Sequence, residues 1–140
     1  MHRVATRRQK HLALIIAREL ASQLATATFI ADADGALVFY NEAAEEILGR
    51  TFTEAGAMPA SEWPSLFSVE DFDGAPVALA DLPGGIALAE QRPAHARVRI
   101  VGLDGERRAI SITAIPLFAH PTEVVGMVAF FWEGDGPGGE

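Results

Sequence analysis

The chain has 140 residues, no cysteine and a formal net charge of −8 at pH 7. This length is enough for one domain with its own core, and the missing cysteine excludes disulfides, thiolate metal ligands and a cysteine nucleophile. Residues 1–18 contain five basic and no acidic side chains, so the rest carries 6 basic and 19 acidic groups, a charge of −13. We therefore expect no nucleic-acid binding by the domain core, because phosphate contacts dominate that affinity.

The first predicted element is an amphipathic helix over residues 11–28, preceded by a basic arm that we interpret as a solvated helix start. Its apolar stripe has to be buried, either on the domain's own sheet or against a second copy. The stripe supplies five dimer-interface candidates: Leu12, Ile15, Ile16, Leu20 and Leu24. The uninterrupted apolar run within this helix is too short to span a membrane. With no cysteine to oxidise, a reducing cytoplasm is the expected location.

Residues 29–49 predict a β-hairpin followed by a capped helix. Asp34-Gly35 lies between two apolar runs and is typical of a two-residue type I′ turn. Asn41 is suited to cap the first turn of the helix, because its side-chain oxygen can accept from free amide groups there. Gly49 is well placed just beyond the end of the helix, where a left-handed residue is common.

The regular spacing of apolar residues weakens between residues 50 and 81, where prolines and glycines favour loops and short helical turns. Aromatic and aliphatic anchors into the core are expected within this segment: Trp63, Leu66, Phe67 and Phe72. Residues 82–91 predict another short helix, with Asp81 as its possible N-cap and Pro93 behind its end.

The last third alternates between apolar and polar residues and predicts three strands, over residues 96–103, 108–117 and 124–132. Asp104-Gly105 marks the first turn between them. On the last strand, Phe130 and Trp132 share one face and Phe131 lies on the other. Both faces are therefore apolar, and one of them must be covered by the first helix or by a partner. Phe131 is accordingly a further dimer-interface candidate.

Two strands, several short helices and three more strands predict an α+β fold with one five-stranded antiparallel sheet and helices on one face. Three segments, FIADADGALVFYNEAAEEILG, LDGERRAISITAIPL and EVVGMVAFFWE, resemble PAS domains in their order and spacing. The first helix resembles the cap that often precedes such domains and supports dimerisation. The resemblance divides the chain into a helical arm (1–27), a PAS domain (28–133) and a Gly-rich tail (134–140).

PAS domains are sensors or interaction modules, and some hold haem, flavin or a small metabolite between the sheet and the central helices. The candidate pocket residues are Phe39, Trp63, Phe67, Ile86, His95, Ile112 and Phe130. Ordinary core packing also accounts for the aromatic members of this set. Without cysteine, the flavin adduct of light sensors is excluded. The helix over residues 82–91 contains no histidine for haem, and His95 is the nearest alternative. Noncovalent flavin remains open, as does the absence of any cofactor.

The sequence predicts no catalytic residues, because neither a phosphate-binding loop nor a nucleophile motif is present. It predicts no metal site, because no pair of histidines has metal-ligand spacing. We expect a sensory module that binds an unidentified small ligand, mediates protein-protein interaction and homodimerisation, or does both, and that signals through a separate effector protein. A haem- or flavin-bound sensor of redox state or gases is the second hypothesis. The third is a small cone-shaped α+β enzyme resembling ketosteroid isomerase, which is disfavoured because the strands begin early and divide into two and three.

Overall fold

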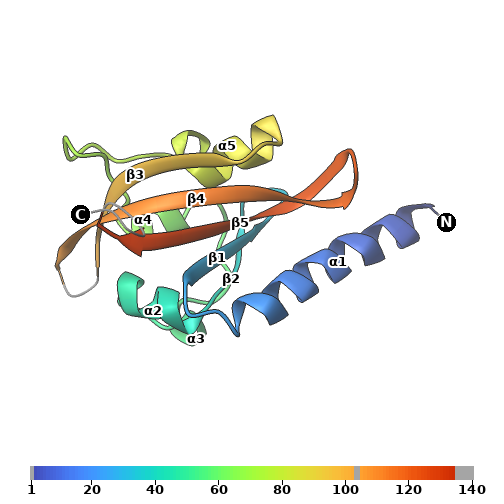
Figure 1. Cartoon of the computed structure of the whole chain (residues 1–140), viewed down its shortest axis with the longest axis horizontal. Coiled ribbons are helices and arrows are strands. Elements are labelled where there is room, and N and C mark those ends of the chain that lie inside the picture. Colours follow the sequence, from blue (N-terminus) through green and yellow to red (C-terminus); the bar gives the residue numbers. More distant parts are fainter. Residues whose placement is uncertain (1, 103–104, 135–140) are drawn as a thin grey trace.

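The computed structural model describes residues 2–102 and 105–134, without the side chains of residues 2–11, 54 and 55. Its strands are β1 (Ala27–Asp32), β2 (Leu37–Tyr40), β3 (Ala94–Val101), β4 (Arg107–His120) and β5 (Glu123–Glu133). The helices are α1 (His2–Ala21), α2 (Glu42–Leu48), α3 (Phe52–Ala55), α4 (Trp63–Leu66), the 3₁₀ helix η1 (Leu79–Asp81) and α5 (Pro83–Glu90) (Figure 1).

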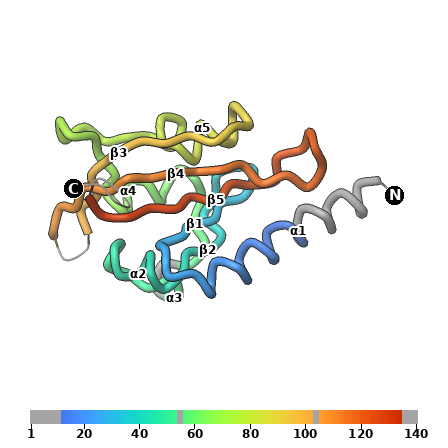
Figure 2. Tube along the Cα trace, in the orientation of Figure 1, coloured from blue at the N-terminus to red at the C-terminus, as the bar shows by residue number. Residues whose placement is uncertain are grey.

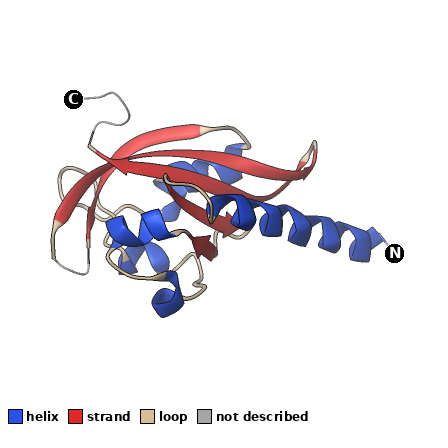
Figure 3. Ribbon diagram, turned by 60° about the horizontal axis from the view of Figure 1, so that its bottom comes forward, coloured by secondary structure: helices blue, strands red, loops and turns tan. Residues whose placement is uncertain are grey.

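The strands form one antiparallel sheet in the order β2-β1-β5-β4-β3. The Cα trace shows β4 and β5 running side by side along the length of the molecule (Figure 2). The short helices cover one face of the sheet, here called the inner face. Helix α1 lies along the opposite, outer face (Figure 3). The predicted fold class is confirmed, including the helix that precedes the domain.

The two faces of the sheet have separate apolar cores, because successive strand residues point to opposite sides. The larger core lies under the short helices and includes Phe29, Met127 and Phe131. The smaller core lies under α1 and is centred on Ile30 and Val128. Strands β1 and β5 therefore contribute to both cores, so they connect the layer of short helices with α1.

The first hairpin is closed by a three-residue loop, which corrects the expected two-residue turn. Gly35 has a left-handed φ of 82°, and Asp34 does not, whereas a type I′ turn needs both residues there. The Asp32 carboxylate explains the difference, because it accepts from the amides of Asp34 (2.9 Å) and Ala36 (3.1 Å). This contact holds the chain in a wider loop. The predicted turn at Asp104-Gly105 lies partly outside the described residues.

Asn41 caps α2 as predicted. Its side-chain oxygen accepts from the amide of Ala44 at 3.0 Å, and Gly49 ends the helix at a left-handed φ of 78°. The same side chain also holds the segment before β1, because its nitrogen donates to the carbonyl oxygens of Ala21 and Thr26, both at 2.9 Å. Asn41 is buried, so these contacts are shielded from water.

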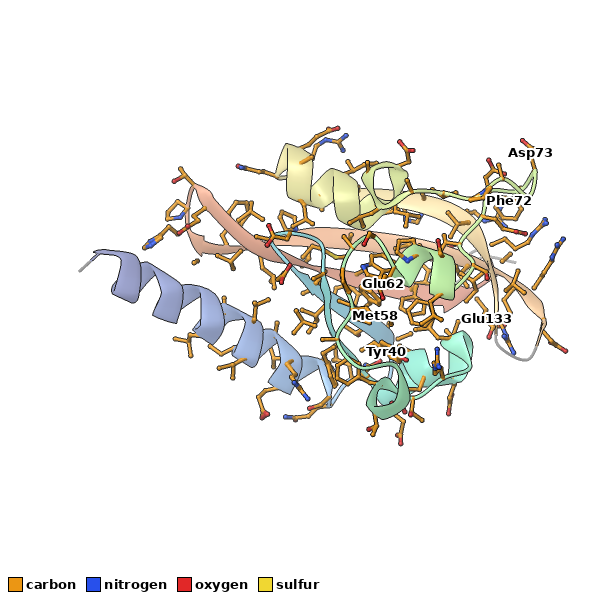
Figure 4. The ribbon with its side chains drawn as sticks, turned by 180° about the vertical axis from the view of Figure 1, so that it is seen from behind. Tyr40, Met58, Glu62, Phe72, Asp73 and Glu133 are labelled. Carbon is orange, nitrogen blue, oxygen red and sulfur yellow. The ribbon has the colours of Figure 1, made fainter. Side chains whose placement is uncertain are left out.

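Other boundaries differ from those expected. Helix α1 ends at Ala21, well before residue 28, and α5 begins at Pro83. Asp81 is not the N-cap of α5, because it belongs to the preceding 3₁₀ turn. Leu82 occupies the N-cap position instead, and its side chain makes no cap hydrogen bond. Phe72 is not a core anchor: its side chain is 43% exposed, and the guanidinium groups of Arg97 and Arg99 lie over its ring. Figure 4 shows Phe72 beside Asp73 at the end of the molecule away from α1.

Helix α1 crosses β5 at Gly126. A Cβ at this position would meet the carbonyl oxygen of Ala31 and would lie 3.0 Å from Leu14 Cδ2. Glycine therefore allows the helix to pass close to the sheet. Leu14, Ala17 and Ala21 face the outer core at this crossing.

Candidate functional site

A cavity of about 60 Å³ lies between the inner face of the sheet and the short helices. Strand residues form one wall: Phe29, Ile100, Ile110, Ile112, Met127, Ala129 and Phe131. The helical layer and its loops form the other: Leu48, Trp63, Phe67, Val69, Leu82, Pro83 and Gly84. Every one of these residues is apolar, and nearly all are buried. The cavity is a gap in the larger apolar core.

Trp63 is fixed in the wall by its polar edge. Its indole Nε1 donates to the carbonyl oxygen of Gly35 at 2.8 Å, and its ring lies 4.6 Å from the ring of Phe29. The first hairpin thus holds the indole nitrogen, and the hydrocarbon part of the ring contributes to the cavity wall. The one polar side-chain group in the lining is therefore already satisfied.

Gly84 and Met127 meet at another part of the wall. A Cβ on Gly84 would lie 2.5 Å from Met127 Cε, so the end of the Met127 side chain occupies the space that a side chain on residue 84 would need. Gly85 serves a different purpose, because its Cβ would overlap the carbonyl oxygen of Leu79 in the preceding 3₁₀ turn. These two contacts explain the pair of glycines inside a helix, which the sequence alone left unexplained.

Three of the candidate pocket residues, Trp63, Phe67 and Ile112, line the cavity. The other four do not. Ile86 is partly buried on α5 but does not line the cavity, and His95 is exposed on β3, where its Nδ1 lies 2.9 Å from Thr113 Oγ1. Phe39 and Phe130 pack against the outer core. Phe39 lies under the guanidinium of Arg18, 4.7 Å from the ring centre.

The assignment of the β5 aromatics to the two faces is corrected. Phe131 was expected at a dimer interface, but it is 5% exposed and lines the inner cavity. Phe130 lies on the outer face instead. Alternation along the strand fixes which residues share a face, and it also identifies Met127 and Ala129 as companions of Phe131. It does not determine which apolar face points inward.

The remaining dimer candidates lie on one exposed surface of α1 and the segment after it. Their exposed fractions range from 45% to 62%: Leu12, Ile15, Ile16, Leu20 and Leu24. Leu14, Ala17 and Ala21 occupy the other side of the helix and contact the sheet. Helix α1 therefore has two apolar sides, and the fold covers one of them. We call the exposed set of five residues the outward face.

A larger and more polar groove, about 580 Å³ in volume, lies beside α4 and the loop that follows it. Ser61, Ser65 and Ser68 line it, together with Glu70. Glu70 Oε1 is buried without a hydrogen-bond partner and lies 3.8 Å from Arg107 Nε. The groove therefore differs in chemistry from the apolar cavity.

Among the side chains that the structure describes in residues 2–102 and 105–134, no three histidines or carboxylates are grouped so that they could hold a metal ion. Among the helices of the same ranges, none combines the length and apolar character needed to cross a membrane.

Solved structures with similar folds include a PAS domain from Colwellia psychrerythraea, with a TM-score of 0.63 and 16% identity over 86% of this chain and 95% of that one. A PAS domain from a two-component sensor histidine kinase has a TM-score of 0.58 and 14% identity, covering 89% and 98%. The LOV protein of Rhodobacter sphaeroides has a TM-score of 0.68 and 17% identity, covering 91% and 71%. At these identities the likeness concerns the fold.

No curated protein matches the sequence. The sequence profile of the family described as "PAS fold" matches residues 21–133, which is most of the chain. This match includes all five strands and the short helices that enclose the cavity. The chain therefore belongs to the PAS fold family.

Proposed function

We propose that this protein is a non-enzymatic PAS sensor that binds a small ligand in the inner cavity, forms a homodimer through α1 and signals to a separate effector protein. Membership of the family supports a sensory signalling module. The cavity is the observation that supports ligand binding, because a gap lined only by apolar side chains stays dry and can admit an apolar guest.

Strand β5 offers a physical connection between ligand and output. Met127, Ala129 and Phe131 line the cavity, whereas Val128 between them packs under α1. Packed interiors transmit small displacements, because there is little free space to absorb them. A ligand that moves the inner side chains of β5 is therefore expected to change how α1 rests on the sheet.

Dimerisation is supported by the outward face of α1. Ile15 is 56% exposed and Leu20 is 62% exposed, although both are large aliphatic residues. Exposed apolar patches of this kind usually mark contact surfaces. A second copy brings the same patch, so two outward faces related by a twofold axis can cover each other.

Haem and flavin do not fit the cavity. Pockets for ligands of that size are roughly 300–1,000 Å³ and contain a few placed polar groups. This cavity has about 60 Å³ and no free polar side chain in its wall. His95, the nearest candidate haem ligand in the sequence, lies on β3 outside the lining and contacts Thr113. The second hypothesis is therefore not favoured.

The proposal also includes the class of effector protein and the cellular location. One structurally similar PAS domain comes from a two-component sensor histidine kinase, and a kinase of that kind is one class of effector for this chain. A cysteine-free sequence is suited to a reducing compartment, so we propose a cytoplasmic location.

Native mass spectrometry of the chain purified from its own host tests ligand binding and assembly together. We expect a dimer mass and a small additional mass that disappears on mild activation. A monomer at all concentrations would contradict dimerisation. A protein that never retains or takes up any small molecule would contradict ligand sensing.

A further inference from the structure

We infer that the cavity selects a small, uncharged, apolar ligand, of the size of xenon or a short hydrocarbon, and that Met127 sets the upper size limit. This inference rests on the proposed function, because it names the class of ligand for the same site. Three observations support it: the chemistry of the wall, the volume of the cavity, and the contact between Met127 and Gly84.

The wall offers no partner to a polar ligand. All lining residues are apolar, and the Trp63 N–H is already donated to Gly35. The β5 backbone behind the cavity is paired with β1 on one side and β4 on the other. A polar group that enters without a partner loses roughly 2–7 kcal/mol of hydration, and a charged group loses more. The wall therefore discriminates against alcohols, amides and carboxylates.

The nearest basic side chain on the inner face of β4 is already engaged. Arg108 lies two residues before Ile110 on the same face of the strand. Its guanidinium lies 3.5 Å from the carbonyl oxygen of Ile47 and 3.9 Å from Glu133. A ligand carboxylate would have to displace Glu133, a group of the same charge, before it could bind there.

The volume sets the size class. An apolar cavity of about 150 Å³ in another protein stays dry and binds benzene or xenon. The cavity here, at about 60 Å³, is less than half as large. Xenon and short hydrocarbons are therefore expected to enter without rearrangement, whereas an aromatic ring requires a side chain to move.

Met127 is the side chain that limits the size. It is 1% exposed, it lines the cavity, and its terminal methyl group packs against the bare backbone of Gly84. Because methionine is unbranched and flexible, it fills irregular gaps, and its removal leaves space connected to the cavity. Met127→Ala should therefore enlarge the site and admit benzene.

The test uses the full chain with isoleucine and methionine methyl groups observed by NMR. The probes are xenon, benzene and propionate, titrated separately. Xenon is expected to shift the methyl signals of Ile110, Ile112 and Met127 and to leave Ile30, on the outer side of the sheet, unchanged. Propionate and benzene are expected to leave all of these signals unchanged in the wild type.

Met127→Ala is then expected to bind benzene at least about tenfold more tightly than the wild type, a difference of ~1.4 kcal/mol. Met58→Ala is the matched control, because Met58 packs against the same core but does not line the cavity. Ala129→Val fills the cavity and should abolish the xenon shifts. If Met127→Ala does not fold, the probes on the wild type and on Ala129→Val still decide the class of ligand, and the smaller truncation Met127→Val tests the size limit in its place.

Binding of propionate, or binding of benzene to the wild type more tightly than xenon, would overturn the inferred ligand class and leave ligand sensing intact. Equal gain of benzene affinity in Met127→Ala and Met58→Ala would overturn the role of Met127. If no probe perturbs the methyl groups that line the cavity, both this inference and ligand sensing at the cavity fail.

Discussion

The side-chain nitrogen of Asn41 donates a hydrogen bond of 2.9 Å to the carbonyl oxygen of Ala21, the last residue of α1. The side-chain oxygen of the same residue accepts from the amides of Thr28 and Ala44, both at 3.0 Å. One buried amide thus joins the end of α1, the start of β1 and the first turn of α2. Asn41 is the only asparagine in the chain.

Replacement of Asn41 by alanine is expected to lower the free energy of unfolding by about 2–4 kcal/mol. The loss combines a missing helix cap with buried backbone groups left without partners. Urea unfolding followed by circular dichroism measures it. Glu46→Ala, an exposed change on α2, is the control and should cost much less. Equal losses for both variants would show that the Asn41 contacts add little stability.

Asn41→Asp is expected to separate the two roles of this side chain. The carboxylate keeps the acceptor that caps α2, but it places negative charge against the carbonyl oxygens of Ala21 and Thr26. Amide hydrogen exchange should therefore accelerate at the end of α1 and remain slow in α2. Uniform acceleration across both elements would contradict this division.

Gly84 and Gly85 should respond differently to alanine, although they are neighbours in α5. Alanine favours a helix over glycine by about 1 kcal/mol at both positions. At residue 84 the new methyl group meets the flexible end of Met127, whereas at residue 85 it meets the backbone of Leu79. We expect a change within about 1 kcal/mol for Gly84→Ala and a loss above about 2 kcal/mol for Gly85→Ala in denaturant unfolding. The reverse order would refute the packing explanation.

Gly35 and Gly74 form a second matched pair. Both have left-handed φ angles, 82° and 87°, and both lie three residues after an aspartate, Asp32 or Asp71, whose carboxylate accepts from two amides of the turn. A Cβ on Gly35 would meet Leu79 Cδ2, whereas a Cβ on Gly74 has no neighbour within 4 Å.

Alanine at Gly74 is expected to cost about 1 kcal/mol from backbone strain alone. Gly35→Ala should cost about 2–4 kcal/mol, because steric overlap is added to the strain. Thermal unfolding of the two variants, compared with the wild type, provides the measurement. Similar losses would mean that Leu79 moves aside without cost.

Leu20→Glu is expected to change assembly without changing the fold. Leu20 is 62% exposed on the outward face, so the free energy of unfolding of the monomer should change by only about 0.5 kcal/mol. Light scattering after size-exclusion chromatography should report half the wild-type mass. Gln23→Glu introduces the same charge at an exposed polar residue nearby and should leave the mass unchanged. A dimer that survives Leu20→Glu would exclude the outward face as its interface.

Sequence patterns predicted the sheet well, because alternation and turn residues are local signals. The hairpin over residues 29–40, the Asn41 cap and the three long strands were all visible in this way. The loop that contains Gly35 is one residue longer than the two-residue turn that the sequence predicted. Its geometry depends on the Asp32 carboxylate, which binds two amides further along the chain.

The cavity was harder to predict than the sheet. Trp63, Phe67 and Ile112 were identified because large apolar residues mark the core, but Phe130 and Phe131 were assigned to the wrong faces. Both sides of β5 are apolar, so alternation alone does not distinguish inward from outward. The role of Gly84 could not be predicted from the sequence, because it depends on Met127, 43 positions away.

The crossing at Gly126 has a consequence for the spacing of the layers. Where α1 passes over β5, the sheet presents bare backbone, so the separation between helix and sheet is set by main-chain atoms and the side chain of Leu14. A larger residue at position 126 would meet the carbonyl oxygen of Ala31 as well as the side chain of Leu14, so it would disturb the pairing of β1 with β5 and the packing of α1 together. The close approach of α1 to the sheet at this point, and with it the position of the surface offered to a second copy, therefore depends on a residue that has no side chain.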